Sequence, residues 1–235
     1  MYMPINHTIA EALAKVTARI HQAAHAAGRG DQSVRLIAVS KTQPASVIAQ
    51  AYACGQRDFG ENYLQEALAK QSGLAALIDI QWHFIGPIQS NKTRPIAENF
   101  AWIHSIDREK VAQRLNDQRP ADLPPAQICL QVNIDDESTK AGVSLAELPA
   151  LAQAVRQMPR LQLRGLMAIP AASNTPAQQH LAYARLKAAL CDLNRQGYAL
   201  DTLSMGMSGD LEAAIAEGST MVRVGTDIFG ARTKA

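Results

Sequence analysis

Lys41 and Arg223 are the two side chains whose types and surroundings best predict chemistry. Lys41 closes the apolar run 35–41 and is followed at once by Thr-Gln-Pro, which begins the next element. Burial at a strand end lowers a lysine pKa from its reference of about 10.4, and the neutral amine can form a Schiff base. A lysine that only extends its amine to solvent from a strand end is the competing interpretation.

Arg223 lies in the segment Met-Val-Arg-Val-Gly, which has the length and composition of a strand. Along a strand, Val222 and Val224 share one face and Arg223 shares the other with Gly225. The valines suit the side that faces helices, so we expect Arg223 to point inward. Burial of an unpaired guanidinium is costly, and an acceptor is therefore expected beside it.

Two segments near the end of the chain are rich in Gly, Ser and Thr. Residues 202–210 read Thr-Leu-Ser-Met-Gly-Met-Ser-Gly-Asp, and residues 221–230 read Met-Val-Arg-Val-Gly-Thr-Asp-Ile-Phe-Gly. Small residues let backbone N–H groups approach an anion, and Ser208 precedes a helical pattern whose start would favour one. We predict a phosphate site here, with tight turns that bind nothing as the alternative.

These residues need a scaffold, and the chain alternates strand-like and helix-like segments throughout. The strand-like runs number eight: 35–41, 57–60, 82–86, 101–106, 127–133, 162–169, 202–206 and 221–225. The helical patterns between them cover 45–54, 63–71, 92–99, 108–117, 145–157, 176–196 and 211–216. This alternation predicts an α/β fold, a single (β/α)8 TIM-type barrel, with a doubly wound open sheet as the alternative. Phosphate sites of such barrels follow strands seven and eight, where the two loops fall.

An additional amphipathic helix is predicted within residues 1–28, before the first strand. Its apolar residues recur at helical spacing: Ile9, Leu13, Val16, Ile20 and Ala24. Few residues follow the eighth strand, so we expect this helix to cover the barrel side that an eighth helix would cover. We interpret residues 1–235 as one domain.

Composition excludes several classes of function. The hydrophobic fraction is 47%, the charged fraction 19% and the net charge +2, which indicates neither a nucleic-acid nor a membrane surface. Cys54, Cys129 and Cys191 have no metal-site or disulfide spacing, so we expect buried free thiols, no metal and a cytoplasmic protein.

An amine, an inward arginine and a phosphate site together suit pyridoxal phosphate. This cofactor needs an amine for its aldehyde, a partner for its ring nitrogen and an anion site for its phosphate. An arginine partner cannot accept a proton from the ring, so the ring nitrogen stays unprotonated. Carbanion chemistry would then be restrained.

The segment Trp-His-Phe-Ile-Gly-Pro-Ile-Gln-Ser-Asn-Lys at 82–92 resembles the signature of the pyridoxal phosphate homeostasis protein family. Supporting resemblances lie at 38–41, 59–63, 165–167, 204–208 and 223–226. The family is similar in fold to the N-terminal domain of alanine racemase. The resemblance implies that Lys41 carries the cofactor as a Schiff base and that Arg223 faces the ring nitrogen. It implies further cofactor contacts from the residues Met205, Ser208, Gly209, Gly225 and Thr226.

Four weaker candidates surround this set. Asn62 follows the second strand, where it either contacts the ring or caps a turn. His83 is either a cofactor contact or a hydrogen-bonded core histidine. Lys140 is either a second amine for the cofactor or a solvated loop lysine. The acids at 135–137 lack a further metal ligand and are interpreted as solvated.

The preferred function is a protein that buffers, protects or delivers pyridoxal phosphate without turnover of its own. Its expected partners are the cofactor and apo-enzymes that need it, and a monomer is expected. The alternative is a pyridoxal phosphate-dependent amino-acid racemase, which needs a base on each face of the substrate carbanion. Tyr63 or Lys140 would have to supply the second base. A Schiff-base aldolase without cofactor would explain Lys41 but not Arg223 or the segment 82–92.

Overall fold

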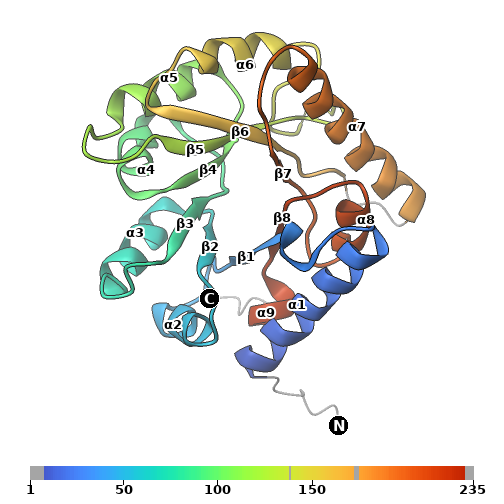
Figure 1. Cartoon of the computed structure of the whole chain (residues 1–235). Coiled ribbons are helices and arrows are strands. Elements are labelled where there is room, and N and C mark those ends of the chain that lie inside the picture. Colours follow the sequence, from blue (N-terminus) through green and yellow to red (C-terminus); the bar gives the residue numbers. More distant parts are fainter. Residues whose placement is uncertain (1–7, 138, 172–174, 231–235) are drawn as a thin grey trace.

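Eight short apolar segments pair side by side in chain order, and the first pairs with the last. The computed structural model describes residues 8–137, 139–171 and 175–230, and within them the parallel strands form a closed barrel (Figure 1). The strands are β1 (Arg35–Val39), β2 (Asp58–Glu61), β3 (Gln81–Phe84), β4 (Trp102–Ile106), β5 (Ala126–Gln131), β6 (Leu161–Met167), β7 (Thr202–Ser204) and β8 (Met221–Val224).

The helices surround the barrel on its outside, as Figure 1 shows. They are α1 (Ile9–Ala26), α2 (Ala45–Ala53), α3 (Leu64–Gly73), α4 (Thr93–Asn99), α5 (Glu109–Gln118), α6 (Leu148–Arg156), α7 (Pro176–Arg195), α8 (Leu211–Ala216) and α9 (Thr226–Phe229). Two 3-10 turns, η1 (Asp31–Ser33) and η2 (Ser90–Lys92), precede β1 and α4. Within the described ranges, no helix combines the length and apolar composition that a membrane crossing needs.

The predicted (β/α)8 barrel is confirmed, and the open sheet is excluded because β1 and β8 pair along four residues. The ends of the elements differ by a few residues from the predicted ones. The largest difference is α6, which begins at Leu148 where the pattern predicted position 145. The Ser144 hydroxyl binds the Glu147 carboxylate at 2.6 Å and accepts the Glu147 N–H at 3.2 Å, which holds this stretch as a turn.

The N-terminal helix α1 lies against the barrel where it was expected, beside α8, α9 and α2 (Figure 1). Thr8 caps it in a reciprocal pair with Glu11, a capping box that satisfies two backbone N–H groups. Val16 and Ile20 are buried in one apolar cluster with Val222 of β8. The helix therefore closes the outer layer of the barrel next to its last strand.

Strand alternation sorts the side chains of β8 as predicted. Val222 and Val224 pack outward with α1, whereas Arg223 is buried on the opposite face. Ile37, its register partner on β1, belongs to a separate interior cluster with Cys129. The barrel interior thus combines a small apolar cluster with buried polar side chains.

The prediction that all three cysteines are buried is wrong for two of them. Cys129 on β5 is buried, and burial raises the pKa of its thiol to about 12. Cys54 and Cys191 are exposed, because they lie on the solvent side of the helical layer, at the end of α2 and within α7. Helical periodicity places a residue in a helix but does not by itself select its face.

We expect α1 to contribute directly to stability. Ile20→Ala should lower the free energy of unfolding by about 2–5 kcal/mol, because it leaves a cavity between α1 and the barrel. Gln22→Ala on the exposed face of the same helix is the control and should change it by less than about 0.5 kcal/mol. Urea denaturation measures both, and equal effects would contradict the packing role of α1.

Candidate functional site

Lys41 lies two residues past the end of β1, at the barrel end where the carboxyl ends of the strands meet. Val39 is in register with Gly60 of β2, and Ala38 with Val224 of β8. Lys41 therefore emerges between the segments that follow β2 and β8. Its side chain is half-buried.

The two residues that flank Lys41 are both held by one charged cluster, in which Glu61 and Lys70 are buried and Glu66 is partly exposed. The Ser40 hydroxyl donates to Glu61 Oε1 at 2.6 Å, and the Ser40 carbonyl accepts from Lys70 Nζ at 2.7 Å. On the other side, the Thr42 N–H donates to Glu66 Oε1. Lys70 joins the two acids, because its ammonium donates to both Glu61 and Glu66. We call Glu61, Glu66 and Lys70 the Lys41 clamp.

Backbone strain at Thr42 indicates how firmly the clamp acts. Thr42 has φ of 65°, a left-handed conformation that is unfavourable for a β-branched residue. Such a conformation persists only where neighbouring interactions enforce it. The hydrogen bond from Thr42 N–H to Glu66 is one such interaction, so the turn after Lys41 is determined by tertiary contacts.

Lys70 is a structural cation and not a second reactive amine. It is 5% exposed, and its three donors are used by Glu61, Glu66 and the Ser40 carbonyl. Glu61 is fully buried, and desolvation raises the pKa of its carboxyl although Lys70 and Ser40 act in the opposite direction. Loss of Lys70 would leave the buried carboxylate of Glu61 without its counter-ion.

Arg223 points into the barrel, where backbone carbonyls accept from it. Its Nη1 donates to the Ser204 carbonyl at 2.6 Å and to Ser204 Oγ at 2.8 Å, and its Nη2 donates to the Ala168 carbonyl at 2.9 Å. The acceptor expected for a buried guanidinium is thus supplied by the ends of β6 and β7. Nε–H and the second proton of Nη2 are the remaining donors of the guanidinium.

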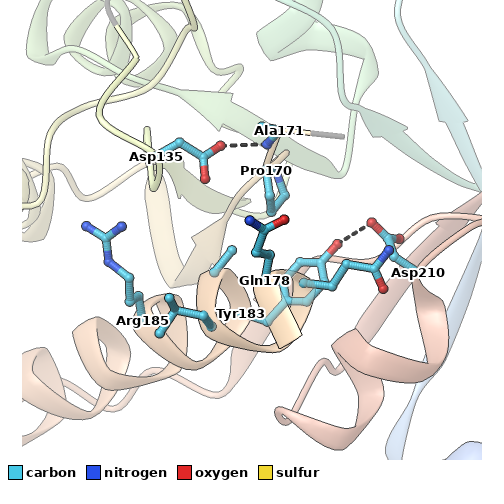
Figure 2. Close-up of a pocket in the computed structure, with 10 residues that line it drawn as sticks. Asp135, Pro170, Ala171, Gln178, Tyr183, Arg185 and Asp210 are labelled. Carbon is cyan, nitrogen blue, oxygen red and sulfur yellow. Dashed lines mark hydrogen bonds between the residues drawn. The ribbon is translucent and has the colours of Figure 1, made fainter. Parts of the chain in front are cut away.

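The loop after β7 is held by Asp210, by Tyr183 of α7 and by Arg19 of α1. Asp210 accepts the Met207 N–H at 2.6 Å and the Tyr183 hydroxyl at 2.7 Å; Figure 2 shows the second contact. Arg19 of α1 donates to the Ser208 carbonyl at 3.1 Å. Gly206 has φ of 93°, and an added Cβ would lie 2.5 Å from that of Ala214, so this turn requires glycine.

Arg19 also connects this loop with the loop after β8. Its guanidinium binds Glu212 of α8 at 2.9 Å and Asp227 of α9 at 2.6 Å. Gly225 follows β8 and lies beside Val39 of β1, and the exposed Thr226 is the first residue of the short helix α9. The predicted pair of loops therefore lies side by side beyond β7 and β8, braced by one side chain of the N-terminal helix.

Asn62 lies in the turn after β2, with its Oδ1 buried and without a hydrogen-bond partner among the described residues. The segment 82–92 fixes the turn by close backbone contact, because a Cβ on Gly86 would lie 2.2 Å from the Asn62 carbonyl oxygen. The Ser105 hydroxyl donates to the Gly86 carbonyl and holds it there. Glycine in this segment is therefore a packing requirement that positions Asn62.

His83 lies deeper in the barrel than the mouth and is fully buried. Its Nε2 contacts Asp58 Oδ1 and its Nδ1 contacts His104 Nε2, each at 2.9 Å. Both ring nitrogens are therefore used within the protein. This placement agrees with the hydrogen-bonded core histidine that the sequence left as an alternative.

Lys140, the other candidate amine, is ion-paired in the loop after β5. Its Nζ lies 2.7 Å from Asp135 Oδ2, which also accepts the Ala171 N–H at 2.6 Å, as Figure 2 shows for the second contact. Asp135 therefore links the loop after β5 to Ala171 in the loop after β6, so the prediction that it is only solvated is wrong. In the described ranges no cluster of His, Cys, Asp or Glu converges as a metal would need.

A pocket of about 280 Å³ lies between these loops and α7, and it ends at Asp210 (Figure 2). Asp135 and Ala171 line one side of it, and Tyr183 and Asp210 line the other. The pocket therefore extends from Asp135, the partner of Lys140, to Asp210 in the loop after β7.

Sequence reasoning missed the side chains that support Lys41 and Arg223, namely Glu61, Glu66, Lys70, Ser204 and His104. Polar residues inside apolar strands are a signal that could have found two of them, since His104 and Ser204 lie in the predicted strands 101–106 and 202–206. No sequence signal distinguishes Lys70 from the other lysines of helices.

Comparison with known proteins agrees with this architecture. The family model described as alanine racemase, N-terminal domain, matches residues 12–233. The structure of alanine racemase from Corynebacterium glutamicum has a TM-score of 0.71 at 19% identity, covers 94% of this chain and 62% of that one, and is similar in fold. The chain is thus a barrel protein of the alanine racemase N-terminal domain class.

More similar proteins define the family within this class. A pyridoxal phosphate homeostasis protein of Pseudomonas aeruginosa is 64% identical and covers 96% of each chain, and one of Escherichia coli strain K12 is 54% identical and covers 95% of this chain and 97% of its own. The structure of PipY from Synechococcus elongatus with pyridoxal phosphate bound has a TM-score of 0.84 at 40% identity and covers 95% of this chain and 100% of that one. This chain belongs to the pyridoxal phosphate homeostasis protein family.

The Lys41 clamp makes a testable prediction about stability. Lys70→Met should lower the free energy of unfolding by about 3–5 kcal/mol, because Glu61 stays buried without its counter-ion. The loss should shrink as the pH falls, since burial raises the folded-state pKa of Glu61 and protonation removes its charge. Urea denaturation between pH 5 and pH 8 measures this trend.

The double variant Glu61→Gln with Lys70→Met is the control, because it removes both buried charges. It should be more stable than Lys70→Met at pH 8 and show a weaker dependence on pH. Equal stability of the two variants over the whole range would contradict the assigned ion pair.

Proposed function

We propose that this protein binds pyridoxal phosphate as a reversible Schiff base on Lys41 and serves in homeostasis of the cofactor. The observation that carries the proposal is the convergence of three parts at one barrel mouth. These are Lys41, whose neighbours Ser40 and Thr42 are held by the Lys41 clamp, a buried guanidinium at Arg223 and two braced small-residue loops. Family membership and the pyridoxal phosphate in the PipY structure support it.

The chemistry of the donor set fits this cofactor. Arg223 Nε–H is a donor suited to an unprotonated ring nitrogen, and Asn62 Oδ1 is a buried acceptor that has no described partner. We assign the phosphate to the two loops, through the residues Ser208, Gly209, Gly225 and Thr226. Met205 is fully buried at the start of the loop after β7. When bound, the cofactor supplies an aldehyde that reacts reversibly with amines.

His83 is assigned a different role from the remaining candidates. Both of its ring nitrogens bind protein groups, so we propose that it supports the site from the barrel interior. Lys41 then acts as a tether, Arg223 as the ring partner and the loops as the anion site.

A role without turnover is part of the proposal. A racemase needs two bases, and the residues considered for the second one are poorly placed for it. Tyr63 is 53% exposed, and Lys140 is paired with Asp135. An arginine that keeps the ring nitrogen unprotonated also weakens the electron sink that racemisation requires. Storage or delivery of the cofactor to apo-enzymes suits such a site better.

We further propose a monomer that works in the cytoplasm. The exposed thiols of Cys54 and Cys191 are unpaired in the structure, as is usual for proteins of reducing compartments. Size-exclusion chromatography with light scattering measures the oligomeric state.

The tether can be tested by chemical reduction. Borohydride added to the protein after incubation with pyridoxal phosphate should attach the mass of the reduced cofactor to Lys41, as peptide mass spectrometry would detect. Lys41→Ala should lose the visible absorbance of the Schiff base. Lys110→Ala, an exposed lysine of α5, is the matched control and should behave like the unsubstituted protein.

A protein that stays colourless and gains no mass under these conditions would overturn the proposal. Attachment at another lysine with Lys41 unmodified would overturn the assignment of the tether alone.

The absence of turnover has its own measurement. Amino acids incubated with the loaded protein in deuterium oxide should take up no deuterium at the α-carbon beyond the rate of free cofactor. Faster incorporation that is lost in Lys41→Ala would favour the racemase alternative.

A further inference from the structure

A continuous chain of hydrogen bonds crosses the barrel interior from the cofactor end to the opposite end. Arg223 Nη1 contacts Ser204 Oγ at 2.8 Å, and the same Oγ contacts His104 Nδ1 at 2.9 Å. His104 Nε2 contacts His83 Nδ1 at 2.9 Å, and His83 Nε2 contacts Asp58 Oδ1 at 2.9 Å. Ser204 ends β7 and Asp58 begins β2, so the chain spans the length of the barrel.

The two ends of this chain determine the direction of every hydrogen bond in it. An ionised carboxylate only accepts, so a neutral His83 must carry its proton on Nε2 and accept at Nδ1. His104 must then donate from Nε2 and accept at Nδ1. The hydroxyl of Ser204 donates to His104, which turns an oxygen lone pair toward Arg223, a group that only donates. The five groups thus form one consistent donor order.

Burial keeps both histidines neutral, as this order requires. His83 and His104 are fully buried inside the barrel. Desolvation lowers the pKa of His83 below its usual value although Asp58 acts in the opposite direction, and it lowers that of His104 well below. His83 also stacks on Trp102, with ring centroids 5.7 Å apart. The side chain of Asp58 is 17% exposed, and its Oδ1 lies 2.9 Å from His83 Nε2 and 3.4 Å from Arg35 Nη1.

We propose that Ser204, His104, His83 and Asp58 are positioning residues that hold the guanidinium of Arg223 in its orientation toward the cofactor ring. This inference rests on the proposed function of the site. A serine hydroxyl rotates freely unless its proton is committed to an acceptor, and here His104 is that acceptor. Fixing the hydroxyl keeps a lone pair of Ser204 Oγ directed at Arg223 Nη1 and leaves Nε–H and the second Nη2 proton to serve the ligand. Asp58, at the far end of the hydrogen-bond chain, sets the direction in which each group donates.

The donor order can be measured without cofactor. ¹⁵N–¹H spectra of the imidazole groups in the ligand-free protein at pH 7 should place His83 and His104 both in the Nε2–H form. Asp58→Asn keeps the shape but removes the charge that sets the direction, so the Nδ1–H form should become populated at both rings. An Nδ1–H form of His104 in the unsubstituted protein, or no tautomer change in Asp58→Asn, would overturn the proposal.

Ser204→Ala tests the effect on binding. It should weaken the affinity for pyridoxal phosphate about tenfold, because the guanidinium loses one hydrogen bond and its fixed orientation. Thr93→Val is the matched control: it removes another fully buried hydroxyl, on α4, and should change affinity within about twofold.

The outcomes distinguish this inference from the proposed function. Equal affinity losses in Ser204→Ala and Thr93→Val, or none in either, would reduce the chain to a purely structural network. A failure of the unsubstituted protein to bind pyridoxal phosphate would contradict the proposed function, while the tautomers of the ligand-free protein still test the chain.

Discussion

The burial of a permanent cation inside the barrel is the constraint on which the rest of the site depends. Arg223 is 4% exposed, and a guanidinium in such a place is tolerated only if its donors are satisfied. The ends of β6 and β7 supply two carbonyls, and Ser204 supplies a hydroxyl. Through Ser204, the requirement extends to two buried histidines and ends at a carboxylate on the far side. These polar side chains inside the barrel are therefore linked, directly or through Ser204, to the one buried charge of Arg223.

The other half of the site follows a different principle. Lys41 is positioned through its neighbours, because the Lys41 clamp binds Ser40 and Thr42 on either side of it. The clamp thus fixes the backbone on both sides of Lys41. The proposed tether on the segment after β1 and the buried cation on the neighbouring β8 would suit retention of a cofactor. Racemisation would in addition require a second base poised on the opposite face of the substrate.

Much of this architecture could be predicted from the sequence. Alternating apolar runs and amphipathic helices were enough for the barrel, and the valines beside Arg223 were enough for its inward direction. The glycine-rich segments were correctly placed after the last two strands. Cys54 and Cys191 were predicted to be buried but are exposed, because a helical pattern of small residues does not show which face of the helix is buried. Glu61, Lys70 and His104 were missed because their partners lie on other elements.

The sequence by itself determined the period of each element, the order of strands and helices, and the residue types available for Schiff-base chemistry. Those properties are local, since they depend on side-chain alternation and on neighbours within a few positions. Only the tertiary structure decided which polar groups meet. Ser204 and His104 are a hundred residues apart, and Arg19 and Ser208 are still farther apart along the chain. Their hydrogen bonds exist because closing the barrel removes water from its interior, so most buried polar groups there pair with one another.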